Sequence, residues 1–420
     1  MKILAYLLSS LSLLMSILLF IRLKGINMAL FAKLAAASLS LVWALLGAAG
    51  AALGWVYQAF WAVPIGVIGA GIMFWYGWKN TRNHNGFEKA FGADWSNHIT
   101  PQQSRWMVKR RWNLFIRMKT SPQPTVEKDL AFWTVQGTSR EILCDLWRPA
   151  DGNVSGLAFI FFHGSGWFAG DKDFGTRPFF NHLVAQGHTV MDVAYRLCPE
   201  VDLQEMVGDV KRAVTWMKEN ASKYGVDPEK VVLGGGSAGA HIAMLAGYTP
   251  EGPDLTPDEL KNVDLSVRGV VSYYGPVDLE AGYIPWMESN PNSDLPPLPI
   301  GTRIESKDTF KYAGRMDILL GGSPEEVPDM YKIAAPITHV NSETPPTLLL
   351  QGTTDVLVPV EPTELLFTKL VEEGVPAVKV IFPMTEHMFD FLLPQLSPPA
   401  QSALYDVDRF LALLLHKGDK

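Results

Sequence analysis

The stretch Val231-Val-Leu-Gly-Gly-Gly-Ser-Ala-Gly-Ala-His241 decides the predicted fold. An apolar strand runs into a G-x-S-x-G sequence, and an apolar helix follows, which is the context of a turn that exposes a nucleophilic serine. Such a turn is sharp, so Gly235 and Gly239 are expected at the two positions where the backbone needs room. Ser237 is then predicted at the carboxyl end of a sheet strand, with its hydroxyl at the N-terminus of the helix.

The same letters also fit a different motif. Gly234, Gly236 and Gly239 satisfy G-x-G-x-x-G, the fingerprint of a dinucleotide-binding turn. That interpretation needs a second strand ending in an acidic residue about 20 residues further on. Here the helix is followed by the loop Tyr248-Thr-Pro-Glu-Gly-Pro253, so we favour the serine turn.

Around this motif, from about residue 131, short β-rich runs alternate with helical stretches, interrupted by a long segment at about 277–344. This alternation predicts an α/β fold with a mostly parallel sheet covered by helices on both faces. We expect the interruption to be a cap or loop insertion over the site. The predicted strands are 142–147, 157–162, 189–194, 231–233, 270–274, 347–350 and 378–382, and the predicted helices are 179–185, 203–224, 238–247, 362–373 and 401–415.

A glycine-containing loop, Phe161-Phe-His-Gly-Ser-Gly-Trp167, directly follows the strand 157–162. Hydrolysis of an ester by a serine passes through a tetrahedral oxyanion, which requires preorganised N–H donors. The candidate donors are the amides of Ser165, Gly166 and Ala238, with Gly164 in reserve. His163 is interpreted as a residue that organises the loop and not as a general base.

The acid and the histidine that such chemistry requires follow two later strands. Asp355 follows Leu348-Leu-Leu-Gln-Gly, and His387 follows Ile381-Phe-Pro-Met-Thr-Glu. With Ser237 they form the order Ser…Asp…His, in which the histidine takes the serine proton and the aspartate orients the imidazole. Asp390 is the reserve acid.

Together these stretches resemble the α/β-hydrolase fold over residues ~130–420, in the carboxylesterase branch near hormone-sensitive-lipase-like and acetyl- or feruloyl-esterase-like enzymes. Ala194-Tyr-Arg-Leu-Cys-Pro-Glu200 and Ala335-Pro-Ile337 add to the resemblance. It implies carboxylic-ester hydrolysis without a metal or organic cofactor. Two departures are the serine at 165, where the family has glycine, and Met388-Phe389 after the histidine.

Three further polar residues receive structural interpretations. His241 is expected to be a packing residue of the helix after Ser237, and Asp209 to make a surface or structural pair. Glu386, beside His387, is expected to face solvent.

Residues 1–78 have the composition of a membrane anchor. The runs Ile3–Ile21, Leu34–Trp55 and Phe60–Trp78 are each close to the ~20 residues that a transmembrane helix needs, which predicts three spans. Gly50 and Gly54 form a GxxxG pair suited to close packing of the second and third helices. Cleavage of the first run as a signal peptide is the alternative, which the absence of an A-x-A-like site before Arg22 disfavours.

Charge predicts the orientation and limits the partners. Residues 1–119 hold 13 Lys/Arg and 2 acids, whereas the remainder holds 23 bases and 41 acids. The basic residues next to the predicted spans lie mostly on the same side of the membrane as the large domain, and such positive charge is typical of the cytoplasmic side. We therefore expect an integral membrane protein with its catalytic domain on the cytoplasmic side. We expect residues 79–130 to form a basic amphipathic linker, with 104–119 either on an anionic leaflet or packed on the catalytic domain 131–420. This distribution argues against a nucleic-acid partner.

The predicted function is therefore that of a membrane-anchored serine esterase acting on a small-molecule or lipid-like ester. Two alternatives stay open: an acyltransferase that uses the same acyl-enzyme, and a catalytically silent scaffold at the membrane. The two cysteines, Cys144 and Cys198, exclude a disulfide framework and a cysteine-built zinc site, and their sequence does not decide whether they pair.

Overall fold

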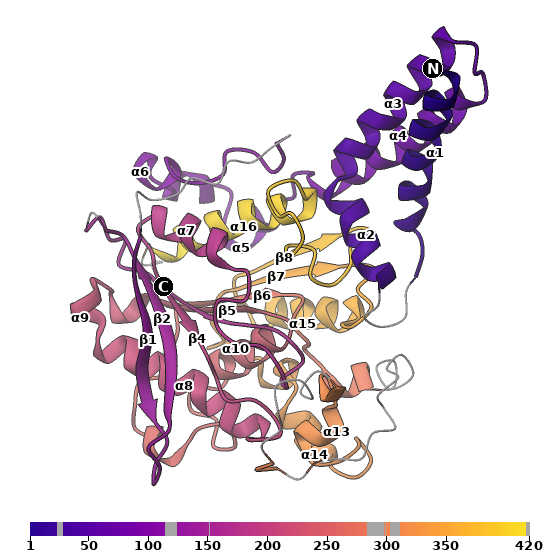
Figure 1. Ribbon diagram of the computed structural model, residues 1–420. Coiled ribbons are helices and arrows are strands. Elements are labelled where there is room, and N and C mark those ends of the chain that lie inside the picture. The colour runs from indigo at the N-terminus through magenta and orange to yellow at the C-terminus, as the bar shows by residue number, and fades with distance from the viewer. Residues whose placement is uncertain are drawn as a thin grey trace.

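A computed structural model describes residues 1–22, 28–113, 124–150, 152–283, 298, 300–302 and 311–416 of the 420-residue chain. An eight-stranded sheet forms the centre of the large domain (Figure 1). Its order is β1-β2-β4-β3-β5-β6-β7-β8, in which β1–β2 and β2–β4 are antiparallel and all other pairs are parallel. The strands are β1 (Thr125–Thr134), β2 (Glu141–Arg148), β3 (Ala158–Phe162), β4 (Thr189–Val193), β5 (Val231–Gly236), β6 (Gly269–Tyr273), β7 (Thr347–Gly352) and β8 (Ala377–Phe382).

Helices cover both faces of this sheet, so the predicted mixed, mostly parallel α/β architecture is confirmed (Figure 1). Strands β3 and β4 are buried along their whole length, as expected for strands covered on both sides. One apolar core includes α8 (Leu203–Glu219) and α10 (Ala238–Tyr248), and a second includes α7 (Arg177–Ala185) and α16 (Pro398–Leu414). A third lies between α10 and α15 (Val360–Glu372).

The sheet begins earlier than predicted. Strand β1 starts at Thr125, six residues before the boundary predicted at 131, and forms an antiparallel edge. Its pairing with β2 is irregular between Glu127 and Leu130, and Asp129 has a φ of 53°. These irregularities break the two-residue periodicity by which a strand is recognised in a sequence.

The residues before the sheet pack on the large domain. This segment contains α5 (Gly86–Phe91), a 3-10 turn η1 (Trp95–His98) and the short α6 (Pro101–Ser104). Phe87 belongs to the core that includes Val378, and Arg111 pairs with the buried Asp406 of α16. Helix α6 ends at Ser104, and the described residues 105–113 that follow it are not helical. Residues 114–119 lie outside the described residues.

Four helices make up the N-terminal region: α1 (Lys2–Leu18), α2 (Met28–Ser38), α3 (Ser40–Val56) and α4 (Ala62–Asn80). In Figure 1, α1, α3 and α4 form a bundle that projects from the domain, and α2 lies at its base. Within the described residues no single helix is long and apolar enough to cross a membrane, so the three predicted spans are not confirmed. Among the helices that the structure describes, only the pair α2 and α3 reaches the required length and apolarity, and the chain bends by 72° between them.

Glycines allow the bundle helices to approach closely. A Cβ at Gly47 of α3 would lie 2.8 Å from the carbonyl oxygen of Gly66 on α4, and one at Gly50 would lie 2.5 Å from Ser9 Oγ on α1. Gly54 contacts Ala62 at the start of α4. The predicted GxxxG pair therefore faces two different helices, and a Cβ at Gly66 of α4 would lie 2.4 Å from Gly47 O.

The insertion at 277–344 lies between β6 and β7 and contains α13 (Met316–Leu320), α14 (Pro328–Ile333) and the 3-10 turn η4 (Pro336–His339). Most of its proline-rich part, 290–299, lies outside the described residues. Cys144 and Cys198 are both free and buried, and burial raises the pKa of both thiols.

Candidate active site

A largely apolar cavity of about 640 Å³ opens at the carboxyl ends of the parallel strands. Its lining includes residues from the loops after β3, β5, β6, β7 and β8 and from the described part of the insertion. Parallel sheets bind ligands at this edge because the loops there converge. Ser237, His387, Gly164, Ser165 and Gly166, which the sequence singled out, all line this cavity.

Ser237 occupies the turn between β5 and α10. Its φ of 54° and ψ of −124° lie in a region that a residue with a side chain rarely adopts, and its N–H donates to Tyr273 O at 2.9 Å. Strained backbone of this kind persists only where the surroundings hold it. The turn therefore places the serine at the cavity wall, where the motif predicted it.

Gly235 and Gly239 permit this turn to pack against β3. A Cβ on Gly235 would lie 2.5 Å from Phe162 O, and a Cβ on Gly239 would lie 2.0 Å from the same oxygen. Both separations are too short for any side chain. The two glycines are thus required by the close approach of the turn to the neighbouring strand.

Asp355 and His387, 32 residues apart in sequence, are brought together by the adjacent strands β7 and β8. The Nδ1 atom of His387 lies 2.8 Å from Oδ2 of Asp355, and both side chains are nearly inaccessible to solvent. Asp355 also accepts the N–H groups of Leu357 and Val358 at 2.9 and 2.8 Å, and Gln351 Nε2 at 3.0 Å. These donors fix the carboxylate, which in turn orients the imidazole.

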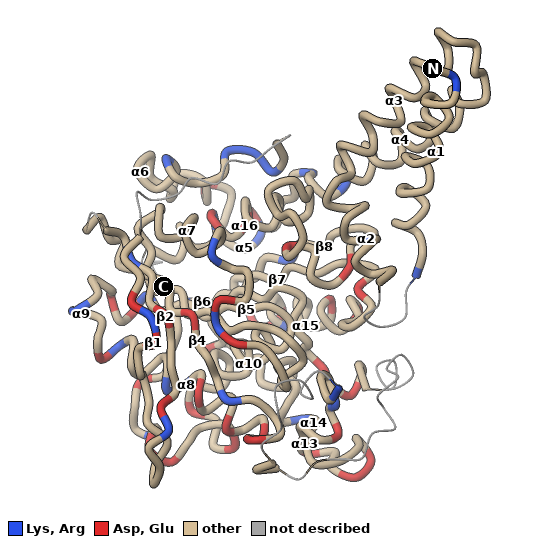
Figure 2. Tube along the Cα trace, in the orientation of Figure 1, with Lys and Arg blue, Asp and Glu red and all other residues tan. Residues whose placement is uncertain are grey.

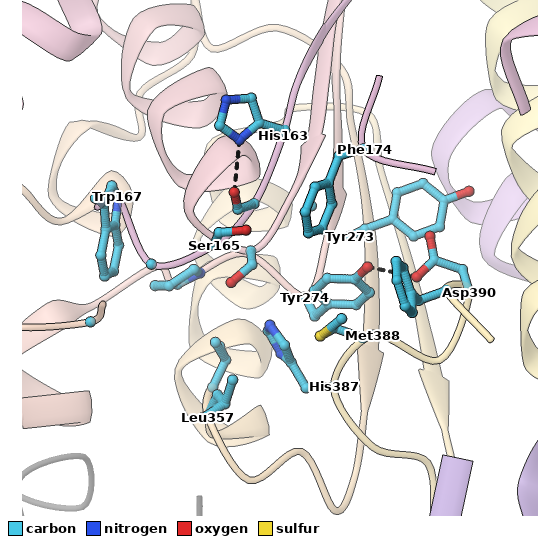
Figure 3. Close-up of a pocket in the computed structure, with 18 of the residues that line it drawn as sticks. His163, Ser165, Trp167, Phe174, Tyr273, Tyr274, Leu357, His387, Met388 and Asp390 are labelled. Atoms are coloured by element: carbon cyan, nitrogen blue, oxygen red, sulfur yellow. Dashed lines mark hydrogen bonds between the residues drawn. The ribbon is translucent and has the colours of Figure 1, made fainter. Parts of the chain in front are cut away.

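The His387 ring points into the cavity (Figure 3). With Nδ1 occupied by Asp355, Nε2 is the nitrogen left to exchange a proton with a group in the cavity. Figure 3 shows Tyr274 and Leu357 beside this ring, and the centroids of the Tyr274 and His387 rings are 4.4 Å apart.

The loop after β3 has an unusual backbone beside Ser237. Ser165, Gly166 and Trp167 have φ values of 102°, 63° and 65°. A Cβ on Gly164 would lie 3.3 Å from Ser237 Cβ, so the loop backbone runs directly past the serine. Within the described part of the chain, no acceptor pairs with the N–H of Ser165 or Gly166. Ala238 is the first residue of α10, where an N–H has no acceptor within its helix.

An oxyanion hole requires uncommitted N–H donors beside a nucleophile, and these amides remain the candidates for that role. The positive φ of Ser165 shows that the serine in place of glycine is held in a conformation that favours glycine. The loop is anchored by Gly314, whose N–H donates to Gly166 O at 3.0 Å.

His163 is buried beneath the same loop and contacts backbone oxygen. Its Nδ1 lies 2.8 Å from Gly164 O (Figure 3). Its ring stacks on Tyr195, whose hydroxyl donates to His163 O at 2.9 Å. Burial lowers the pKa of His163, so the ring is neutral at pH 7 and donates from Nδ1.

His241 links the loop after β3 to the insertion. Trp167 Nε1 donates to His241 Nδ1 at 3.2 Å, and His241 Nε2 donates to Ala334 O at 2.7 Å. The imidazole is fully buried, and burial lowers its pKa to about 4. The sequence placed His241 in the packing around the serine turn but contained no signal for this bridge.

Asp390, the reserve acid, has a different partner. It accepts a 2.6 Å hydrogen bond from the Tyr274 hydroxyl (Figure 3). Asp355 is the carboxylate bonded to His387. Burial raises the pKa of Asp390. Asp209 forms a buried structural cluster, accepting from Arg196 and Arg212.

The prediction that Glu386 faces solvent is wrong. Its side chain is buried and forms an ion pair of 2.6 Å with Lys33 of α2. Phe31, on the same helix, lines the cavity. A single sequence contains no signal for either contact, because more than 350 residues separate Lys33 from Glu386. Among the described residues, no group of three or more His, Cys, Asp or Glu side chains could hold a metal ion.

The chain is similar to known esterases in sequence. It is 31% identical over 276 residues to a Mycobacterium tuberculosis protein named "Probable carboxylic ester hydrolase LipM", an alignment that covers 64% of this chain and 57% of that protein. Its identity to "Esterase LipQ" of the same organism is 28%, covering 60% of this chain and 55% of the relative. The chain thus spans little more than half the length of these curated relatives.

Solved structures share the fold. A thermophilic esterase from the Planctomycetes species Thermogutta terrifontis, with butyrate bound, superposes with a TM-score of 0.51 at 24% identity, covering 69% of this chain and 94% of that one. A truncated carbohydrate esterase from gut microbiota superposes with a TM-score of 0.53 at 21% identity, covering 71% and 100%.

The sequence profile of the BD-FAE family matches residues 144–370, which is more than half of the chain. The matched range includes Ser237 and Asp355 and ends before His387. The chain therefore has an α/β-hydrolase-like fold and belongs to the BD-FAE family.

Proposed function

We propose that this protein is a serine hydrolase that cleaves carboxylic esters through an acyl-enzyme intermediate. The observation that carries the proposal is the 2.8 Å hydrogen bond between His387 and Asp355 in a cavity that Ser237 also lines. The esterase names of the curated relatives support the same chemistry.

In the proposed reaction, Ser237 Oγ attacks the ester carbonyl while His387 Nε2 takes the hydroxyl proton. The oxyanion accepts hydrogen bonds from the amides of Ser165, Gly166 and Ala238. His387 then gives its proton to the leaving alcohol, which breaks the ester bond. A water molecule, deprotonated by His387, hydrolyses the acyl-enzyme by the same route. Asp355 remains ionised and stabilises the imidazolium formed in each step.

The cavity favours an ester with an apolar acyl or alcohol group. Phe161, Phe179, Tyr273 and Leu404 contribute apolar wall, and the lining also contains the polar side chains of Ser237 and His387. An apolar pocket with a few convergent polar groups suits a substrate of which the greater part is hydrocarbon.

We also propose that the N-terminal bundle anchors the protein in a membrane. Large apolar side chains on its outside are exposed, among them Ile3 (76%), Trp55 (72%) and Trp61 (75%). Figure 2 shows Lys and Arg positions at the end of the bundle nearest the domain, besides Lys2 at the N-terminus. A bundle of this kind is stable in lipid, and the positive end supports a cytoplasmic catalytic domain.

The hydrolase proposal is tested with Ser237→Ala in the full chain purified in detergent. Hydrolysis of short p-nitrophenyl esters and covalent labelling by a fluorophosphonate should both be lost, and the apparent Tm should be retained. Undiminished ester hydrolysis in Ser237→Ala would refute the mechanism. The anchor is tested by alkaline extraction of membranes, from which an anchored chain is not released, and sidedness by protease accessibility of the large domain in sealed vesicles.

A further inference from the structure

The loop that carries His387 is held by helices of the N-terminal region. This loop, residues 383–392, follows β8 and is called here the histidine loop. Asn80 Nδ2 of α4 donates to Pro383 O at 3.2 Å, and the Tyr76 hydroxyl lies 3.1 Å from Thr385 Oγ1. At the other end of the loop, Ser38 Oγ of α2 donates to Leu392 O at 2.7 Å.

The central contact is a buried ion pair beside the proposed base. Lys33 Nζ of α2 lies 2.6 Å from Glu386 Oε1, and the two side chains are only 2% and 1% exposed. Glu386 directly precedes His387 in the chain. Lys33 also donates to Ile21 O at 2.7 Å and lies 3.5 Å from Thr354 Oγ1, the residue before Asp355. One ammonium group thus contacts the residues next to both Asp355 and His387.

Among the described residues, Lys33 is the only cation that forms an ion pair with Glu386. Burial raises its pKa, the contact with Lys33 lowers it, and the charge of Asp355 raises it. Its second oxygen, Oε2, has no hydrogen-bond partner among the described residues. Removal of Lys33 would leave a buried carboxylate next to Asp355, a costly arrangement that is relieved when Glu386 takes up a proton or when the loop moves, and either change loses the contact that holds the loop to α2.

The backbone of the loop also requires support. Met384 and Met388, on either side of Glu386 and His387, have φ values of 52° and 60°. Residues with side chains keep such conformations only where surrounding contacts hold them. The contacts from α2 and α4 described above supply part of that support.

We propose that Lys33 is a positioning residue for catalysis, which acts through Glu386 to hold His387 in line with Asp355 and Ser237. The N-terminal helices are then a structural part of the active site in addition to their proposed role as an anchor. This inference rests on the proposed hydrolase function. The expected effect of Lys33 is on the chemical step and not on substrate binding, because neither Lys33 nor Glu386 lines the cavity.

The test compares Lys33→Met, Lys33→Arg, Glu386→Gln and the double variant Lys33→Met/Glu386→Gln in the full chain. Active sites are counted by exhaustive fluorophosphonate labelling, and kcat, KM and the rate of labelling are measured per site. Lys33→Met should lower kcat and the labelling rate about 10- to 100-fold with KM within twofold. Lys33→Arg keeps the charge and should retain at least a fifth of kcat. The double variant leaves no buried charge unpaired and should recover at least fivefold over Lys33→Met.

Arg212→Met is the matched control for lost stability. Arg212 of α8 is similarly buried and pairs with the buried Asp209 and with Glu259, but it does not contact the histidine loop. This variant should lower the Tm while kcat and the labelling rate per site stay within twofold.

The inference is overturned if Lys33→Met keeps kcat and labelling rate within twofold, or if Arg212→Met loses them equally. Glu386→Gln, whose side-chain oxygen can still accept from Lys33, should retain at least a fifth of kcat. If Lys33→Met does not fold, the double variant decides, because it lacks the ion pair and leaves no buried charge unpaired; a kcat and labelling rate within twofold of the wild type in that variant also overturn the inference. Failure of the proposed function would appear as ester hydrolysis that Ser237→Ala retains at the wild-type rate. It is therefore distinguishable from failure of this inference, which is measured in the Lys33 and Glu386 variants.

Discussion

The ring of Tyr274 lies 4.4 Å from the ring of His387, and the Tyr274 hydroxyl donates a 2.6 Å hydrogen bond to Asp390. This tyrosine therefore forms one wall of the imidazole site and also satisfies a carboxyl group whose pKa is raised by burial. Its two contacts have separate consequences, because one depends on the ring and the other on the hydroxyl.

Tyr274→Phe keeps the ring and removes the hydroxyl. We expect kcat to fall less than fivefold and the free energy of unfolding to fall by about 1–2 kcal/mol, because Asp390 loses its donor. Tyr274→Ala also removes the wall beside His387 and should lower kcat at least tenfold. Steady-state kinetics and urea denaturation distinguish the two effects. Equal kcat values in both variants would show that the ring does not constrain the imidazole.

Asp355→Asn should distinguish the two carboxyl groups near His387. An amide at residue 355 cannot stabilise the imidazolium and favours the wrong tautomer, so kcat should fall by roughly 10³- to 10⁴-fold. Asp390→Asn, whose partner is Tyr274, should lower kcat less than tenfold. The reverse order of these losses in steady-state ester hydrolysis would make Asp390 the functional acid.

Phe31→Ala tests whether α2 contributes to substrate binding. Phe31 lines the cavity and is 40% exposed, so its removal should cost about 1 kcal/mol of apolar contact. We expect KM for long-chain p-nitrophenyl esters to rise about fivefold, with little change for acetate. Met28→Ala is the control on the same helix, because Met28 is 82% exposed and does not line the cavity. A uniform change across chain lengths would argue against a wall contributed by Phe31.

Gly239→Ala should disrupt the serine turn. The added Cβ would lie 2.0 Å from Phe162 O, a backbone atom of β3 that cannot move away by a rotamer change. We expect a loss of about 4 kcal/mol or more in the free energy of unfolding, seen as poor yield of folded protein in detergent gel filtration. Gly71→Ala, in α4 with no atom within 4 Å of the added Cβ, should fold normally. Normal stability of Gly239→Ala would contradict the close packing of the turn.

Lys211 should make stability depend on pH. It is buried in α8, where its ammonium contacts Thr249 O and Thr256 Oγ1, and burial lowers its pKa from 10.5 to about 7. Between these two values the unfolded chain binds a proton that the folded chain does not, so this group makes stability rise with pH from about 7 to about 10.5. Below pH 7, Lys211 is protonated in both the folded and the unfolded chain, and the cost of burying its charge lowers the free energy of unfolding in full.

Lys211→Met removes this titration. The free energy of unfolding of the wild type relative to the variant should increase by on the order of 3 kcal/mol between pH 7 and pH 10. Urea denaturation at intervals of one pH unit measures it. Parallel pH profiles for the two proteins would mean that Lys211 is protonated in the folded chain throughout.

Local sequence predicted the parallel part of the sheet well. Strands β3 to β8 are short, largely apolar runs bounded by helices or turn residues, and such runs are readable without tertiary information. Strand β1 was missed because a bulged edge strand with mixed polarity lacks that periodicity. The structure divides the second predicted membrane run, 34–55, between α2 and α3, which meet at a 72° bend. The sequence did not indicate this bend because the run is apolar throughout.

The sequence by itself determined the order Ser237, Asp355 and His387, the strand end at which each lies, and the glycines that the serine turn requires. These features are local, because each depends on a strand, a turn and the residue that follows. Only the tertiary structure decided which carboxylate bonds His387, that Glu386 is buried, and that α2 reaches the histidine loop. Those are contacts between segments distant in the chain, and one sequence contains no record of which distant side chains meet when the helices and the sheet pack.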